Sequence, residues 1–175
     1  MQDLEILNNS YLIIGGPKTN KSEVSRILAK TLKFKLINLD REKYSYFDDF
    51  TDYDFNIFYK LKDDNEEKAL NYIHKYEMKH LNYVLDNINS NVVIDFGNTY
   101  TLIDNKNLLN KIKLFKNIIL LENIDYLEKE NSLVNKLYRN KVNYDIATVR
   151  INIKNKSIDN IVKEILNYKE FKNIL

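Results

Sequence analysis

Apolar residues along the 175-residue chain gather in short runs that alternate with stretches of helical periodicity. Five runs have the length and composition of buried strands. They lie at residues 11–14, 34–39, 91–96, 117–121 and 148–153. Residues 148–153 alternate between apolar and polar side chains, whereas the other runs are nearly continuous. We therefore predict five strands, most of them covered on both faces.

The stretches between these runs repeat their apolar residues at the spacing of amphipathic helices. We expect helices from residue 21 onward, over 66–88, 101–115 and 124–138, and after Ser157, which suits the N-cap of the last helix. Residues 44–64 are rich in aromatic and acidic side chains without a clear period, and we expect short helices and loops there. Strand and helix alternate about five times. This order predicts an α/β fold over residues 1–175 as a single domain, with a mostly parallel sheet and helices on both faces.

The turn after the first run holds two of the three glycines and the only proline of the chain, Gly15, Gly16 and Pro17. The phosphate-binding pattern G-x-x-x-x-G-K-[ST] is matched there except that Asn20 replaces the second glycine. Asparagine adopts positive φ more readily than most residues, so it is a mild replacement. We predict that the turn binds the phosphates of ATP, and an ordinary strand-to-helix turn is the alternative. The cofactor-binding residues would be Gly15, Gly16, Pro17, Lys18, Thr19, Asn20, Lys21 and Ser22.

Within this turn, Lys21 would reach the β and γ phosphates and Ser22 would offer its hydroxyl to Mg²⁺. The N-terminus of the following helix adds partial positive charge. Two carboxylates follow later strands: Asp40 comes after the second run and Asp95 ends the third, just before Gly97. Carboxylates at strand ends face the ligand crevice of an open α/β sheet. Asp95 would orient Mg²⁺ through water, or it is a loop acid without a ligand.

The charge pattern argues against several classes of partner. The formal net charge is +2, and acidic and basic residues are interspersed, so no basic stripe suggests nucleic acid. No apolar run approaches the ~20 residues that span a bilayer, and the N-terminus lacks the pattern of a signal peptide. The chain has no cysteine, and its two histidines lack the spacing of a metal motif. We expect a cytoplasmic monomer that acts on a small molecule.

With these residues placed, the chain resembles the shikimate kinase family of P-loop small-molecule kinases. That family has an Asp-x-Asp pair after the second strand, and Asn38 and Asp40 occupy these positions. The resemblance implies a three-layer P-loop kinase fold, with Lys21 and Asp40 as catalytic residues. Asp40 would hold the acceptor hydroxyl and assist its deprotonation. Ser22, Asn38 and Asp95 would surround Mg²⁺, although Asn38 lacks the charge of the family's first Asp.

The resemblance also implies a substrate site formed by Asp40, His74, Gly97 and Arg139. Arg139 keeps the spacing of the family's arginine that pairs with the shikimate carboxylate, and a surface arginine is the alternative. His74 replaces the arginine of a Phe-Arg-x-x-Glu motif whose glutamate corresponds to Glu77. A histidine pairs with a carboxylate only when it is protonated. Gly97 is what remains of a Gly-Gly-Gly turn.

One departure from the family pattern concerns the lid. The segment between Leu121 and Arg139 is too short for the usual lid and lacks its arginine, which Lys129 or Lys136 would replace in part. The first interpretation is ATP- and Mg²⁺-dependent phosphorylation of shikimate or a similar small carboxylated polyol. The second is a catalytically impaired relative that binds nucleotide or a protein partner, with the aromatic residues of 44–59 as contact surface. A third is another nucleotide or metabolite kinase, whose acceptor has no carboxylate for Arg139.

Overall fold

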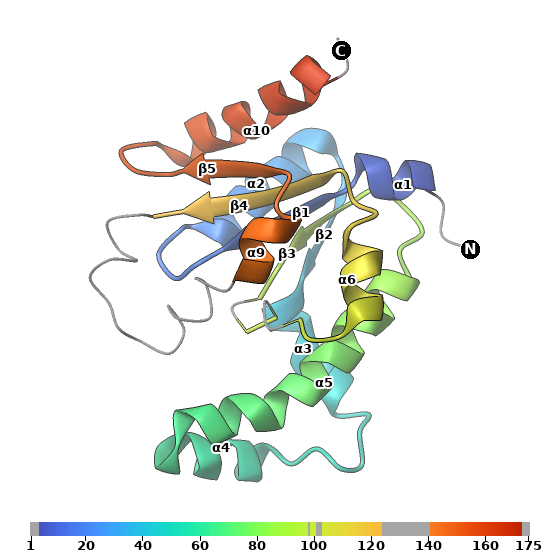
Figure 1. The fold of residues 1–175 in the computed structure, drawn as a ribbon, viewed down its shortest axis with the longest axis vertical. Coiled ribbons are helices and arrows are strands. Elements are labelled where there is room, and N and C mark those ends of the chain that lie inside the picture. The colour runs from blue at the N-terminus through green and yellow to red at the C-terminus, as the bar shows by residue number, and fades with distance from the viewer. Residues whose placement is uncertain (1–3, 98, 101–102, 124–140, 173–175) are drawn as a thin grey trace.

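A computed structural model describes residues 4–97, 99–100, 103–123 and 141–172 of the chain. Its centre is a sheet of five parallel strands in the order β2-β3-β1-β4-β5 (Figure 1). The strands are β1 (Tyr11–Gly15), β2 (Lys35–Asn38), β3 (Val92–Asp95), β4 (Asn117–Glu122) and β5 (Val149–Asn152). Every residue of β1 and β3 is buried, and β5 alternates between buried and exposed positions. The five predicted strands and their parallel arrangement are confirmed.

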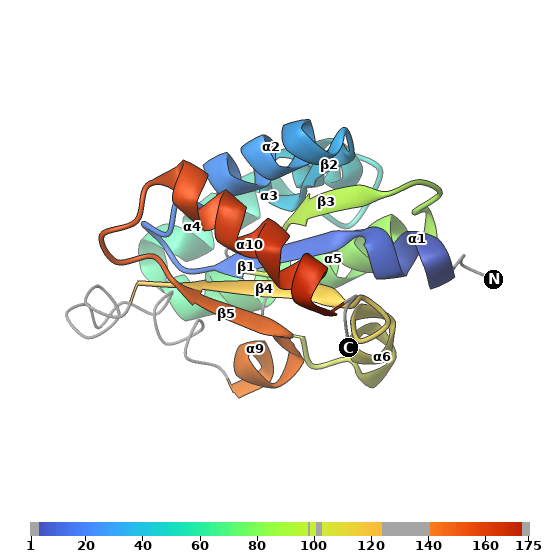
Figure 2. The same cartoon turned by 90° about the horizontal axis from the view of Figure 1, so that it is seen from above.

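Helices cover both faces of this sheet (Figure 2). Helices α2 (Lys21–Leu32) and α10 (Ile158–Lys172) pack on one face, where Leu28 and Ile161 meet Ile13. The other face is covered by α1 (Leu4–Asn9), α5 (Glu66–Asp86), α6 (Lys106–Ile112) and α9 (Lys141–Ile146). The strand alternation explains this division, because Ile13 and its neighbour Leu12 point to opposite faces. The fold is therefore a three-layer α/β sandwich.

Helix α4 (Phe55–Asp64) and the first half of α5 extend away from the sheet, at the bottom of Figure 1. Helix α3 (Leu39–Phe47) connects β2 to this extension. The extension has an aromatic core of its own, formed by Phe47, Ile73 and Tyr76 with surrounding rings. Most of the aromatic residues of 44–64 thus pack against one another, and the short helices expected there are present.

Several predicted boundaries were wrong, and local hydrogen bonds explain them. The second strand ends at Asn38, because the Asn38 side chain accepts a hydrogen bond from the Arg41 N–H (2.8 Å) and starts α3. Asp40 therefore lies in the first turn of a helix. The predicted helix 101–115 is described from residue 103 onward, and that part is helical only over Lys106–Ile112, because Asn105 caps its start through the N–H groups of Asn107 and Leu108.

Further outcomes concern the other predicted helices. The long helix predicted at 66–88 ends at Asp86, and α1 was not predicted. Ser157 accepts a hydrogen bond from the Asn160 N–H (3.3 Å), which confirms its predicted role at the start of α10. The helix predicted at 124–138 lies outside the described residues. Among the helices that the structure describes, none has the length and apolar character needed to cross a bilayer.

Candidate functional site

The loop between β1 and α2 has the backbone conformation that its sequence predicts. Asn20 adopts φ 54° and ψ 25°, the left-handed region in which the motif prefers glycine, and Lys18 also has positive φ at 57°. Thr19 closes the loop, because its N–H and its hydroxyl both donate to the Gly16 carbonyl (3.3 and 2.7 Å). A Cβ on Gly15 would lie 2.7 Å from the Thr19 Oγ1 atom, so only glycine fits there.

This loop borders a cavity of about 570 Å³ at the carboxyl end of the sheet. Its wall includes the seven residues from Gly16 to Ser22, together with Glu23, Arg26, Leu36, Asn38 and Arg41. The N-terminus of the 12-residue helix α2 therefore opens into the cavity along with several basic side chains. Free backbone N–H groups and positive charge at a helix N-terminus favour a phosphate ligand.

Lys21 and Asp95 form a buried ion pair behind this loop. The Lys21 Nζ atom lies 3.0 Å from the Asp95 Oδ1 atom, and the two side chains are 8% and 2% exposed. That contact lacks the alignment of a hydrogen bond, so we treat it as an ion pair. The register of the sheet creates it, since Asp95 ends β3 beside Ile13 of β1 and Lys21 follows the loop after β1. An anion that replaced Asp95 beside Lys21, or a cation that replaced Lys21 beside Asp95, would bind in a defined place that is largely shielded from water.

Asn38 completes this group through its amide. Its Nδ2 atom donates to the other carboxylate oxygen of Asp95 (2.5 Å), while its Oδ1 atom accepts the Arg41 N–H. Its oxygen is thus used by α3 and its nitrogen by Asp95. This geometry places Asn38 as a support for Asp95. The expected Mg²⁺ role of these residues stays a prediction.

The described residues include no group of three or more His, Cys, Asp or Glu side chains that would hold a metal ion without other ligands. Mg²⁺ that binds together with a nucleotide needs fewer protein ligands, because phosphates and water complete its octahedral shell. Ser22, in the cavity wall, and Asp95, beside Lys21, carry oxygen atoms of the kind that Mg²⁺ binds, so the residues present fit such a complex.

Asp40 lies against Gly97 on the other side of Asn38. A Cβ on Gly97 would lie 2.5 Å from the Asp40 Oδ1 atom and 2.6 Å from the Tyr100 ring, so the glycine permits this close approach. The same Asp40 oxygen pairs with Lys43 (3.1 Å), and Lys43 also pairs with Glu77 (2.9 Å). The Asp40 side chain is 37% exposed, whereas Glu77 is fully buried. One carboxylate thus remains accessible to a ligand.

Lys43 was missed by the sequence analysis. Burial alone would lower its pKa, but the charges of Glu77 and Asp40 outweigh that effect and raise the pKa above the ordinary value. The only signal in the sequence is its position three residues after Asp40, which places both side chains on one face of a helix. Its second partner, Glu77, comes from α5 and is found only in the folded chain.

The two predicted carboxylate-binding residues have different outcomes. His74 lies one turn before Glu77 on α5, and its Nε2 atom is 3.4 Å from Asp104, so a carboxylate of the protein itself occupies that side of the ring. Arg139 lies outside the described residues, as do Lys129 and Lys136 and the segment discussed as a lid. The structure therefore brings together Asp40 and Gly97 of the predicted substrate site, and places His74 beside Asp104.

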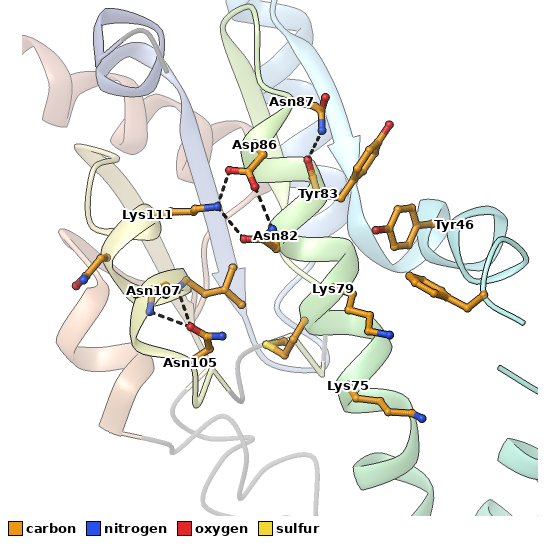
Figure 3. Close-up of a pocket in the computed structure, with 14 residues that line it drawn as sticks. Tyr46, Lys75, Lys79, Asn82, Tyr83, Asp86, Asn87, Asn105, Asn107 and Lys111 are labelled. Atoms are coloured by element: carbon orange, nitrogen blue, oxygen red, sulfur yellow. Dashed lines mark hydrogen bonds and ion pairs between the residues drawn. The ribbon is translucent and has the colours of Figure 1, made fainter. Parts of the chain in front are cut away.

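A larger groove of about 960 Å³ runs along α5 and α6 (Figure 3). Its cations are engaged by neighbouring side chains: Lys111 contacts Asp86 (2.5 Å) and Asn82 (2.8 Å), and Lys75 contacts Asp52 (3.2 Å). None of the residues predicted to bind nucleotide, substrate or metal lines it. We therefore assign the phosphate-binding part of the candidate site to the smaller cavity at the phosphate loop, whose wall includes neither Asp40 nor Gly97.

The sequence matches no model of a protein family and no curated protein. Solved structures do match. The shikimate kinase of Aquifex aeolicus superposes with a TM-score of 0.64 at 18% identity, over 94% of this chain and 98% of that chain. The shikimate kinase of Acinetobacter baumannii in complex with shikimate also gives 0.64, at 14% identity over 99% and 100%.

A third similar structure is that of the YorR protein of Bacillus subtilis in complex with phosphorylated GDP, with a TM-score of 0.55 at 19% identity over 94% and 98% of the two chains. Similarity at such low identity concerns the fold, and a fold alone does not define a reaction. The chain has the P-loop small-molecule kinase fold, in the form found in shikimate kinases, at 18% and 14% sequence identity to the two kinases above.

Proposed function

We propose that this protein is a nucleotide-dependent kinase that phosphorylates a hydroxyl group of a small molecule, and that this acceptor is shikimate or a similar small carboxylated polyol. The observation that carries the proposal is the buried Lys21–Asp95 ion pair behind a phosphate-sized loop, at the N-terminus of α2. Lys21 in this position can bind an anion such as a phosphate, and Asp95 can bind a cation.

The proposed cofactors are ATP and Mg²⁺, which supply the γ-phosphoryl group and neutralise its charge during transfer. The backbone N–H groups of residues 16–22 would hold the phosphates, and Lys21 would exchange its contact with Asp95 for phosphate oxygens. Ser22 and Asp95 would provide oxygen ligands for the metal ion. Catalysis of this kind depends on positioning and on electrostatic stabilisation.

Asp40 is the residue proposed to act on the acceptor. Its partly exposed carboxylate lies on the first turn of α3, beside Gly97, where an acceptor hydroxyl can approach it. There it would accept the hydroxyl proton and fix the orientation of the oxygen. Arg139 would bind the acceptor carboxylate, whereas the His74 ring faces Asp104 of the protein itself. The shikimate complex of the Acinetobacter baumannii kinase supports an acceptor of this class.

A second candidate function is nucleotide binding without turnover. The observation in its favour is Asn38, which stands in place of a carboxylate and whose amide binds Asp95 (2.5 Å). A neutral residue there weakens the attraction for Mg²⁺. The absence of a recognisable lid sequence also favours it, because lid closure excludes water from the reacting groups. A partner protein would then recognise the nucleotide-bound form of this protein.

The test is a coupled assay of ADP production with ATP, Mg²⁺ and a panel of acceptors: shikimate, gluconate and nucleoside monophosphates. Lys21→Met is the test variant, and Lys30→Met, which changes an exposed lysine on the same helix, is its matched control. Acceptor-dependent turnover that is lost only in Lys21→Met supports the kinase. ATP binding by calorimetry without any turnover supports the second candidate. No ATP binding and no turnover contradict both.

A further inference from the structure

On the acceptor side of the site, the central cation is the ammonium group of Lys43, a residue of α3. The Lys43 ammonium group contacts the Asp40 carboxylate at 3.1 Å and the Glu77 carboxylate at 2.9 Å. The Lys43 side chain is 9% exposed and Glu77 is fully buried, so their contact is shielded from bulk water, whereas Asp40 is 37% exposed. Glu77 is held further by the Thr99 hydroxyl, which donates to the same oxygen (2.5 Å). Asp40, Lys43, Glu77 and Thr99 thus form one continuous bridge from α3 to α5 and the segment after β3.

The bridge restrains the residue proposed to deprotonate the acceptor. Asp40 alone is an exposed side chain on the first turn of a helix, and such side chains rotate freely. Lys43 fixes one of its oxygens, and Gly97 lets the carboxylate lie close to the chain after β3. The other oxygen is then held in a constant direction. Preorganisation of a general base in this way contributes directly to catalytic rate.

Among the described residues, two aromatic rings also lie near the Lys43 ammonium group. Besides Asp40 and Glu77, its charge lies 5.5 Å from the ring centre of Tyr44 and 5.8 Å from that of Tyr100. His80 lies near enough for this charge to contribute to the lowering of its pKa, although burial is the larger cause. A lysine has three N–H donors, and in the described residues the two carboxylates are its hydrogen-bond acceptors. One of its three donors therefore has no hydrogen-bond acceptor among the described residues.

His74 offers less than Lys43 in this position. Its Nε2 atom faces Asp104 at 3.4 Å, and it carries charge only when protonated. Glu77, the glutamate that the resemblance pairs with position 74, contacts Lys43 instead. Lys43 of α3, which is permanently charged, thus contacts Glu77, whereas the resemblance predicts a positive charge at position 74 of α5.

We propose that Lys43 is the positioning residue of the acceptor site: its ammonium group ties Asp40 to Glu77 and supplies the positive charge that the resemblance assigns to position 74. This inference rests on the proposed kinase function. It implies that affinity for an acidic acceptor does not depend on protonation of a histidine.

The first experiment measures acceptor kinetics from pH 6 to 9 for the wild type, Lys43→Met, Lys43→Arg, His74→Gln and Lys79→Met, the last an exposed lysine on α5 as control. Lys43→Met keeps Asp40 but releases its position, and a misplacement of about 1 Å can cost about 10²-fold in rate. Lys43→Met should therefore lose about that much in kcat and raise the acceptor KM, with the KM for ATP unchanged. Lys43→Arg should recover part of the loss, and the wild-type acceptor KM should be flat over this pH range.

An acceptor KM that rises steeply above pH 7 in the wild type, but not in His74→Gln, would overturn the proposal in favour of His74. A Lys43→Met variant with wild-type kcat would overturn it as well.

A second experiment needs no turnover and separates this inference from the proposed function. Thermal melts of Lys43→Met, Glu77→Gln and the double variant report whether the two residues are coupled in the free protein. We expect the double variant to melt no lower than Lys43→Met, because Lys43→Met leaves Glu77 buried without its cation and Glu77→Gln removes that charge. Additive losses would refute the bridge even if the kinase is active. Coupled losses without acceptor turnover would retain the bridge and refute only the proposed reaction.

Discussion

Replacing Asn38 with aspartate would place a second carboxylate against Asp95 and remove the amide that now donates to it at 2.5 Å. The change is confined to this contact, because aspartate caps helices as well as asparagine does, so the start of α3 is preserved. The variant restores the charge that the Asp-x-Asp pattern has at this position. In the free protein we expect it to be destabilising.

The magnitude follows from two terms. A hydrogen bond to a charged group contributes about 1.5–3 kcal/mol. Two like charges about 4 Å apart repel by about 4 kcal/mol at the effective dielectric constant of a protein surface. Lys21, 3.0 Å from Asp95, and rotation of the new side chain offset part of this cost. We expect a net loss of about 2–4 kcal/mol, which lowers the melting temperature by about 5–15 °C for a chain of this size.

Urea unfolding at pH 7 and pH 5, with and without Mg²⁺ and ATP, measures the effect. Two adjacent carboxylates come to share a proton as the pH falls, so the loss should be smaller at pH 5 than at pH 7. Mg²⁺ with ATP should recover most of it. Asn38→Ala, which removes the cap and the amide without adding charge, should show neither dependence. An Asn38→Asp variant as stable as the wild type at pH 7, or one indifferent to both pH and Mg²⁺, would refute this account of the site.

Three further predictions concern single residues. Gly97→Ala should cost about 1–3 kcal/mol in urea unfolding and lower acceptor-dependent turnover more than ATP affinity, because its Cβ would meet the Asp40 carboxylate at 2.5 Å; wild-type kinetics would contradict this. Asn20→Ala should melt lower than Asn20→Gly by the equivalent of about 1 kcal/mol, since φ is 54° there, and equal melting temperatures would count against backbone strain. His80 has its pKa lowered from 6.5 to about 4, chiefly by burial and secondly by the Lys43 charge, so the folded state favours its neutral form. The stability that this group contributes is present above pH 6.5, and about 3 kcal/mol of it is lost as the pH falls to 4. When the free energy of unfolding is measured across that range, His80→Gln should flatten its slope against pH. An unchanged slope would exclude His80 as the source.

The loop and the sheet could be predicted because both follow from local sequence. Gly15 and Lys21 lie within a few residues of each other, and the positive φ of Asn20 is a local property that its residue type favours. The buried strands are continuous apolar runs, and parallel pairing then brings Asp95 to the phosphate loop.

The roles of Asn38 and Lys43 could not be predicted, because they depend on side chains distant in sequence. Asn38 was expected near Mg²⁺, but its oxygen caps α3 and its nitrogen binds a carboxylate 57 residues away. Lys43 meets Glu77 34 residues away. The spacing that aligned His74 with an arginine also gave no indication of Asp104, which the turn before α6 places beside it.

The most direct test of the central claim is the detection of phosphoryl transfer itself. The wild type is incubated with γ-labelled ATP, Mg²⁺ and shikimate, and the label in the acceptor is measured by ³¹P NMR or chromatography, with Lys21→Met and Lys30→Met in parallel. The account predicts a labelled acceptor with the wild type and with Lys30→Met, and none with Lys21→Met. The account would be contradicted if no label left ATP with shikimate or with the other acceptors of the panel, gluconate and nucleoside monophosphates. It would also be contradicted if Lys21→Met labelled the acceptor as well as the wild type does.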